Sequence, residues 1–208
     1  MKISIVNYGC GNIGSVVNML KHIGVGTEVI STPDEVRIAD KIILPGVGKW
    51  DAGASSLMNS GVLVALEERV LVDKIPFLGI CLGMQLLLSA SEEGNLPGLG
   101  WISGKVKSFS FPKPANGDRR LAVPHMGWNS VTVQQNSTLT ESLTANSKFY
   151  FVHSYYAVPD NSENIIIQAN YGHDFTCGIR KENIYGLQFH PEKSHKHGMD
   201  IMKSFSSI

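Results

Sequence analysis

The sequence predicts an α/β fold, in which a doubly wound, mostly parallel central sheet has helices on both faces and added antiparallel strands. Up to about Ser91, short apolar runs alternate with helical patterns, the order expected of parallel strands joined by right-handed crossovers. Three of these runs lead into glycine-rich turns, at Gly9–Gly11, Pro45–Gly48 and Gly79–Gly83. After Ser91 the content of Gly, Pro, Asn and Ser rises and short alternating runs follow, which is typical of antiparallel strands.

The composition predicts one globular domain spanning residues 1–208. Of the 208 residues, 43% are hydrophobic and 17% are charged, which suits one well-packed core and is short for two. Lys plus Arg and Asp plus Glu both number 18, so no large basic surface for nucleic acid is expected. The cysteines suggest no disulfide framework, no apolar run approaches the ~20 residues of a membrane helix, and no leader segment is recognisable. A reducing cytoplasm is the expected compartment.

The first half of the chain supplies the parallel strands and most of the helices. Thr32 to Glu35 forms a capping box with Pro33 at the first helical position, and Gly24 is suited to end the preceding helix. The expected strands are Ile3–Val6, Thr27–Ile30, Lys41–Leu44 and Phe77–Ile80, and helices are expected from Asn12 to Gly24, after Thr32, from Asp51 to Ser60, from Val62 to Asp73 and after Cys81.

The second half supplies shorter strands and a last helix. Pro112 to Arg120 is polar and predicts a mobile loop, and a helix is expected from His195 to Ser206. The expected strands are Gly104–Phe109, Ser130–Gln134, Lys148–His153, Asn164–Asn170, Phe175–Arg180 and Ile184–Phe189.

The glycines of the first turn allow two interpretations. Gly9, Gly11 and Gly14 have the spacing of the dinucleotide-binding fingerprint, between a strand and a helix. The acidic residue that should follow is poorly placed, because Glu28 falls inside the second strand and Asp34 beyond it. Glycines that merely permit a tight turn explain the pattern equally well.

Cys81 is the candidate nucleophile. It ends an apolar strand, begins a helical pattern and has Gly79 and Gly83 two residues away on either side, the layout of a nucleophile elbow with cysteine in place of serine. The sulfur is then expected at the carboxyl end of the strand, where open α/β sheets bind ligands. A lone cysteine is more often buried and inert, so the glycine frame carries this interpretation.

A cysteine nucleophile needs a base and a group that orients the base, and His190 and Glu192 are the candidates. They follow an apolar strand, and residues two apart in an extended segment point the same way. The imidazole would take the thiol proton and later protonate the leaving amine. His195 and His197 form a weak metal-binding pattern without nearby carboxylates or cysteines, so no metal is predicted.

An oxyanion hole is expected from two backbone segments. The N–H of Leu82 directly follows the nucleophile, and Val47 and Gly48 end a neighbouring parallel strand. The flanking glycines lower the energy needed to rotate the peptide at Val47. This loop is therefore also a candidate conformational switch.

These motifs resemble those of the class I (triad) glutamine amidotransferases, in the nucleophile segment Gly79–Gln85 and the segment Gln188–Glu192. Within that family, four further segments resemble the glutaminase subunits of imidazole glycerol phosphate synthase: Tyr8–Asn12, Pro45–Gly48, Pro124–Asn129 and Phe151–Tyr155. The resemblance covers nearly the whole chain and implies the flavodoxin-like fold of the family. It also implies that Cys81 attacks the carboxamide of L-glutamine, that ammonia leaves, and that water hydrolyses the thioester to glutamate without a cofactor.

The resemblance assigns residues to substrate and partner. Gly48, Gln85, Ser154 and Tyr155 match positions that hold glutamine, and Asn12, Trp128 and Lys193 match positions that face a partner. The implied partner is a (β/α)8-barrel cyclase subunit in a heterodimer, which uses the ammonia to make imidazole glycerol phosphate and aminoimidazole carboxamide ribotide in histidine biosynthesis. The loop at Tyr8–Asn12 then faces the partner rather than a nucleotide.

Other functions remain open from the sequence alone. Asn95–Ile102 and Lys193–Met199 resemble a paralogous group that supplies ammonia for amidino-sugar synthesis in surface polysaccharide. A stand-alone γ-glutamyl-type cysteine hydrolase would use the same triad. A binding module without catalysis is disfavoured, because all three triad residues are present. Trp128 would lie in the core if it did not face a partner.

Overall fold

The computed structural model describes residues 2–112 and 121–208, so the predicted loop at Pro112 to Arg120 lies, apart from Pro112, outside the described residues. Its strands are β1 (Ile3–Val6), β2 (Thr27–Ile30), β3 (Ile42–Gly46), β4 (Phe77–Cys81), β5 (Ala90–Ser91), β6 (Gly104–Ser108), β7 (His125–Ser130), β8 (Thr132–Val133), β9 (Lys148–His153), β10 (Tyr155–Pro159), β11 (Ile165–Asn170), β12 (Asp174–Lys181) and β13 (Ile184–Leu187). Its helices are α1 (Ile13–His22), α2 (Pro33–Arg37), α3 (Trp50–Asn59), α4 (Leu63–Glu67), α5 (Leu82–Gln85) and α6 (His195–Ser207), with a π-helical turn at Glu68–Val72 and 3₁₀ turns at Ser162–Asn164 and Pro191–Lys193.

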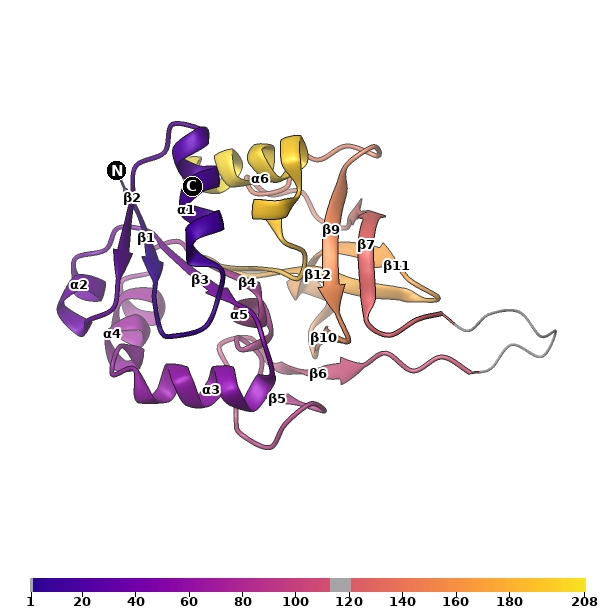
Figure 1. The fold of residues 1–208 in the computed structure, drawn as a ribbon, viewed down its shortest axis with the longest axis horizontal. Helices are drawn as coiled ribbons and strands as arrows, with labels where there is room; N and C mark the ends of the chain where they lie inside the picture. Colours follow the sequence, from indigo (N-terminus) through magenta and orange to yellow (C-terminus); the bar gives the residue numbers. More distant parts are fainter. Residues whose placement is uncertain (1, 113–120) are drawn as a thin grey trace.

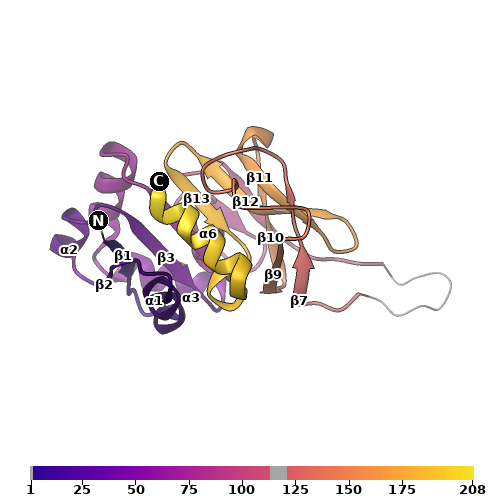
Figure 2. The ribbon, with the colours of Figure 1, turned by 90° about the horizontal axis from the view of Figure 1, so that it is seen from above.

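The central sheet of the described residues has 11 strands in the order β2-β1-β3-β4-β13-β12-β10-β6-β5, with β11 paired to β12 and β8 paired to β11 (Figure 1). The first five are parallel neighbours, and β12, β10 and β6 continue the sheet antiparallel. Helices α1 and α6 cover one face, while α3 and α4 cover the other (Figures 1 and 2). Each face has its own buried apolar cluster against these helices. The predicted fold class is confirmed.

Three features of the sheet differ from the predicted elements. Strand β13 joins the parallel core beside β4 instead of the added antiparallel region, which fits the burial of all four of its residues. Pro45 and Gly46 belong to β3 rather than to a loop, because Gly46 still pairs with Cys81. Helix α5 is a single turn, because the backbone hydrogen bonds change after it: Leu87 N donates to the Met84 carbonyl and Leu88 N to the Gln85 carbonyl, three residues back instead of four.

Strands β5, β7 and β10 lie outside the predicted set. Strand β7 carries polar residues and a glycine, and it pairs with β9 in a separate two-stranded ribbon in which Trp128 lies opposite Tyr150. Its neighbour β8 covers only part of the predicted strand at Ser130–Gln134. The predicted capping box at Thr32 and Glu35 and the left-handed Gly24 after α1 are present.

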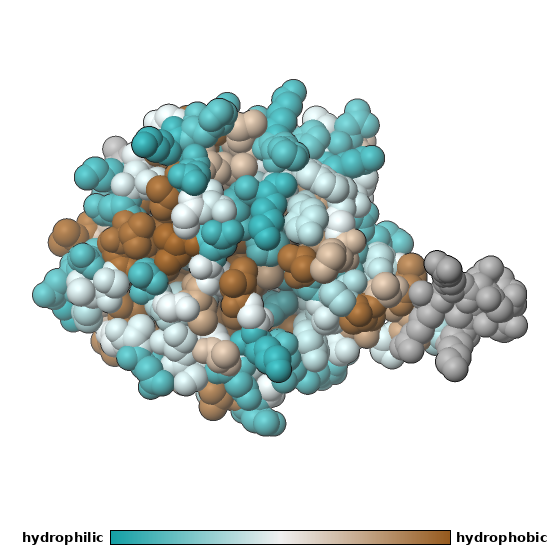
Figure 3. Space-filling model, in the orientation of Figure 1, coloured by the Kyte–Doolittle hydropathy of each residue, from teal (hydrophilic) through white to brown (hydrophobic). Residues whose placement is uncertain are grey.

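The surface in the orientation of Figure 1 carries several separate hydrophobic patches among polar side chains, rather than one continuous apolar area (Figure 3). Within the described residues, none of the helices combines the length and the apolar character that crossing a membrane requires.

Candidate active site

Cys81 lies at the turn between β4 and α5, with φ +55° and ψ −109°. L-residues rarely adopt this backbone conformation, and strain of this kind concentrates at functional sites. The turn needs its glycines, since a Cβ on Gly79 would lie 2.5 Å from the carbonyl oxygen of Gly83. The backbone thus presents the sulfur at the carboxyl edge of the parallel strands.

His190 and Glu192 form a buried pair. His190 Nδ1 lies 2.7 Å from Glu192 Oε1, and the two side chains are 2% and 3% exposed. The expected reason for their meeting was wrong: the segment is a 3₁₀ turn begun by Pro191, in which Lys193 N donates to the His190 carbonyl, and not an extended strand end. The carboxylate accepts from Nδ1, which leaves Nε2 for the substrate side of the ring.

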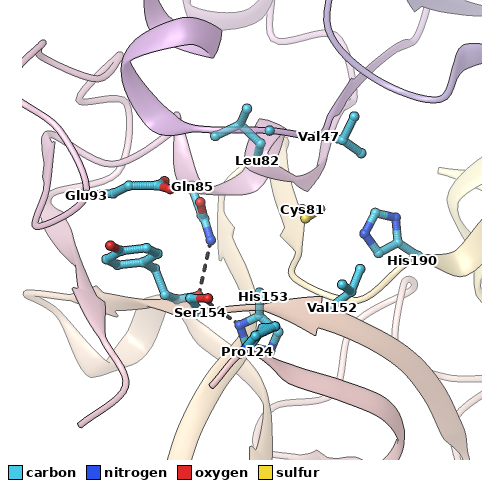
Figure 4. Close-up of a pocket in the computed structure, with 12 residues that line it drawn as sticks. Val47, Cys81, Leu82, Gln85, Glu93, Pro124, Val152, His153, Ser154 and His190 are labelled. Carbon is cyan, nitrogen blue, oxygen red and sulfur yellow. Dashed lines mark hydrogen bonds between the residues drawn. The ribbon is translucent and has the colours of Figure 1, made fainter. Parts of the chain in front are cut away.

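The electrostatic setting makes His190 a strong base. Burial alone would lower the pKa of His190, but the nearby Cys81 and the Glu192 carboxylate outweigh burial and raise it to about 10. Nε2 is buried and has no well-aligned hydrogen-bond partner among the described residues, while the Cys81 sulfur lies next to the ring (Figure 4). Catalytic contacts of this kind commonly tighten only when substrate binds.

One pocket of about 330 Å³ collects most of the predicted site residues (Figure 4). It is lined by Val47, Gly48, Cys81, Leu82, Gln85, Glu93, Pro124, Val152, His153, Ser154, Tyr155 and His190. The volume suits an amino-acid-sized substrate. Glu192 lies behind the imidazole and lines a second pocket, together with Lys193 and Ser15. Asn12, Trp128 and Lys193 do not line the first pocket.

The candidate oxyanion donors flank the sulfur. Leu82 is the first residue of α5, and the N–H of a first helical residue has no partner within its helix. Val47 and Gly48 follow directly after the point at which β3 pairs with Cys81. Their donation to an oxyanion stays a prediction.

The predicted site residues leave out four residues that line the pocket: Glu93, Pro124, Val152 and His153. Glu93 reaches the pocket from a loop and accepts a hydrogen bond from Trp50 N at the start of α3, at 3.0 Å. His153 belongs to a motif noted in the sequence, but its partner His125 lies on the other strand of the ribbon, and only the β7–β9 register brings the two together.

The buried pair His125 and His153 has a fixed direction of hydrogen bonding. His153 Nδ1 donates to the Tyr155 carbonyl at 2.8 Å, because a carbonyl only accepts. Its Nε2 therefore accepts from His125 Nδ1 at 3.1 Å, and His125 Nε2 accepts from Asn129 Nδ2 at 3.3 Å. A further proton on either ring would set two donors against each other. Burial lowers the pKa of His125 to about 4 and that of His153 to about 3.

These two histidines predict a loss of stability on acidification. Because their folded-state pKa values lie below the unfolded value of ~6.5, the unfolded chain binds protons first as the pH falls. The free energy of unfolding should drop by up to about 1.4 kcal/mol per pH unit for each histidine between about pH 6.5 and about pH 4.5. His190 has a raised pKa and is protonated in the folded state throughout this window. It stabilises the folded chain as the pH falls only near pH ~6.5, where this histidine is still partly unprotonated in the unfolded chain.

Urea unfolding across this pH range checks the prediction. His125→Phe places a ring of similar shape against Phe151 and Tyr171, which both stack on His125. The variant should show a shallower pH dependence than the wild-type chain. Equal slopes for the two proteins would contradict the prediction.

Comparison with known proteins agrees with this geometry. The model of the family "Glutamine amidotransferase class-I" matches residues 4–207. The chain is 44% identical to imidazole glycerol phosphate synthase subunit HisH of Leptospira borgpetersenii, covering 99% of this chain and 100% of the relative. It is 46% identical to the HisH subunit of Bdellovibrio bacteriovorus, again over 99% of this chain and 100% of the relative.

Solved structures with low sequence identity share the fold. A putative GMP synthase component from Thermoplasma acidophilum has a TM-score of 0.72 at 20% identity, covering 100% of this chain and 92% of that one. PurLQS from Thermotoga maritima has a TM-score of 0.73 at 17% identity, covering 99% and 97%. From the family match and the full-length similarity to HisH subunits, the chain belongs to the class-I glutamine amidotransferases and, within them, to the HisH family.

Proposed function

We propose that this chain, as one catalytic domain, is a glutaminase that hydrolyses L-glutamine to glutamate and ammonia and supplies the ammonia to a synthase partner in histidine biosynthesis. The observation that carries the proposal is the meeting of Cys81 with the buried pair of His190 and Glu192 at one amino-acid-sized pocket. The full-length similarity to HisH subunits supports the pathway. All three cysteines are free, which suits a reducing cytoplasm.

The proposed reaction has two steps, formation of a thioester on Cys81 and its hydrolysis. The Cys81 sulfur attacks the carboxamide carbon while His190 holds the thiol proton, and the oxyanion is held by backbone N–H groups of Leu82 and of the Val47–Gly48 segment. The C–N bond breaks as His190 gives its proton to the departing nitrogen, which leaves as ammonia. Water then attacks the thioester, loses a proton to His190 and releases glutamate, and the proton returns to the sulfur.

The remaining lining residues fit an amino-acid substrate. Gln85 uses its Nε2 to donate to Gln188 Oε1 and to the Tyr155 carbonyl, while its Oε1 makes no hydrogen bond among the described residues. An ammonium group on the substrate is a suitable donor to that oxygen. Gly48, Ser154 and Tyr155 line the same pocket and are proposed to hold the rest of the glutamine.

The proposed partner, a (β/α)8-barrel cyclase subunit, would dock on the face formed by Asn12, Trp128 and Lys193. The Trp128 side chain is 48% exposed and stacks on His195, with ring centroids 5.4 Å apart. Lys193 lies over the ring of Tyr150, the residue opposite Trp128 in the ribbon.

Asn12 caps α1 by accepting a hydrogen bond from Ser15 N, and Ser15 lines a pocket with Lys193 and His195. Exposed tryptophans in such clusters are typical interface anchors.

Trp128→Ala should weaken the complex with the cyclase subunit by about 2 kcal/mol or more, or roughly 30-fold in the dissociation constant. Calorimetric titration with the partner measures this, and thermal unfolding of the free chain should change little because the indole is half exposed. Val64→Ala changes an exposed residue on α4, on the opposite face of the sheet, and should bind normally. An unchanged dissociation constant for Trp128→Ala would remove this residue from the interface.

The function itself is tested by measuring glutamine turnover in the free chain and again after adding the cyclase subunit with its phosphoribosyl substrate. A sharp rise in turnover with formation of imidazole glycerol phosphate supports the proposal. Turnover that is as fast in the free chain as in the presence of the cyclase subunit would favour the γ-glutamyl-type hydrolase. Ammonia transfer only to a sugar acceptor would favour the polysaccharide paralogue.

A further inference from the structure

Gln188 is a buried side chain that touches the candidate nucleophile but has no part in the reaction described above. It is fully buried, and its Nε2 lies 3.7 Å from Cys81 Sγ, within hydrogen-bonding range for sulfur. A hydrogen bond donated to a charged group favours the charged form over the neutral one. Helix α5 has only four residues, so its dipole provides little stabilisation of a thiolate and leaves room for another donor.

A single backbone carbonyl fixes which end of the Gln188 amide faces the sulfur. The Tyr155 carbonyl only accepts, so the Gln85 group 3.2 Å from it must be the NH₂ group. The same Nε2 lies 3.0 Å from Gln188, and the atom it meets there must be the acceptor Oε1. The NH₂ group of Gln188 is therefore the end left for Cys81.

The Tyr155 carbonyl is itself held in place. It accepts a second hydrogen bond, from His153 Nδ1 at 2.8 Å, and carbonyl oxygens have two lone pairs for two such donors. His153 is oriented in turn by His125 and Asn129 on the ribbon strand β7. Each member of this chain has one consistent role as donor or acceptor, so the amide of Gln188 has no alternative orientation of equal energy.

From this geometry we infer that Gln188 is a further catalytic residue, whose side-chain amide donates to the sulfur of Cys81 and favours its thiolate, and that Gln85 and the Tyr155 carbonyl position it. The inference rests on Cys81 being the nucleophile of the proposed glutaminase. Its role differs from that of His190, which moves the proton, because the Gln188 amide keeps its protons throughout and only stabilises charge on sulfur.

The test is the pH dependence of Cys81 alkylation by iodoacetamide, measured by mass spectrometry of the Cys81 peptide so that Cys10 and Cys177 are counted separately. Gln188→Met keeps the size of the side chain and removes the donor. Gln188→Glu keeps the shape and places a negative charge beside the sulfur. At about pH 7 we expect Cys81 alkylation to slow by about 10- to 100-fold in the Met variant and further in the Glu variant. The pH profile of Cys81 alkylation should move to higher pH in both variants. Their kcat for glutamine should fall with little change in KM.

The control is Gln134→Met, the same change at an exposed position beyond β8, which should leave the alkylation profile unchanged. Profiles of both Gln188 variants that coincide with this control would overturn the inference and leave Gln188 a packing residue. The alkylation measurement needs neither glutamine nor a partner. If the proposed glutaminase function were wrong, glutamine turnover would be absent in the wild-type protein, while the Gln188 variants would still show slower alkylation of Cys81.

A second measurement covers the case in which the variants do not fold. In the wild-type protein the side-chain NH₂ resonances of Gln188 should shift as Cys81 titrates, and they should shift again when Cys81 is alkylated. Resonances that stay constant through both changes would overturn the inference without any substitution.

Discussion

Replacing Cys81 with alanine should abolish glutamine hydrolysis, with a loss of at least about 10⁴-fold in kcat, because removal of a triad nucleophile typically costs about 10⁴- to 10⁶-fold. The reason is chemical, since no thioester forms without the sulfur. The fold should persist, because alanine fits the space and the strained turn depends on its flanking glycines. Release of ammonia from glutamine, with and without the cyclase subunit, measures the effect.

Cys10→Ala is the matched control, since Cys10 is also a free cysteine near the carboxyl end of a parallel strand but does not line the pocket. It should hydrolyse glutamine at the wild-type rate. Binding of the cyclase subunit should be unchanged in Cys81→Ala. Turnover near the wild-type rate in Cys81→Ala would remove Cys81 from the mechanism.

His190→Asn should slow thioester formation by about 10²- to 10⁴-fold, the range by which general acid–base catalysis accelerates such steps. The asparagine can still face Glu192, but it cannot hold a proton between the sulfur and the departing amine. Rapid-quench trapping of the thioester measures the step directly. In the wild-type enzyme the pKa of His190 is raised, and the variant lacks this titrating group, so the pH dependence of the step should also flatten in the variant.

His22→Asn is the control for this substitution, because His22 is an exposed histidine at the end of α1 and does not line the first pocket. It should form the thioester normally in the free chain. A His190→Asn variant with normal thioester formation would assign the base to another group, and His153 would be the next histidine in the pocket to test.

The backbone turn at Cys81 could be predicted because its signal is local. Two glycines around one cysteine are enough to specify a tight turn between a strand and a helix, whatever the rest of the chain does. The neighbouring pair of His190 and Glu192 was predicted for the same reason, although Pro191 starts a 3₁₀ turn where an extended segment was expected. The predicted site residues that do line the pocket all come from short, recognisable motifs.

Other contacts could not be predicted, because they join residues that no local pattern connects. Gln188 meets Cys81 across 107 positions of sequence, and it does so only because β13 lies beside β4 in the parallel core. The predicted strand at Ile184–Phe189 had the right residues but was expected in the antiparallel region. His125 meets His153 through the pairing of β7, a strand whose glycine and polar residues gave no strand signal.

By itself, the sequence determined the alternation of strands and helices, the elbow at Cys81 and the choice of His190 and Glu192 as its candidate partners, because hydrophobic spacing and turn residues act within a few positions of the chain. The tertiary structure alone decided the strand order, the orientation of the Gln188 amide and the exposure of Trp128. Those depend on which distant segments pack together, and a hydrogen-bond direction is fixed only when every buried donor meets an acceptor.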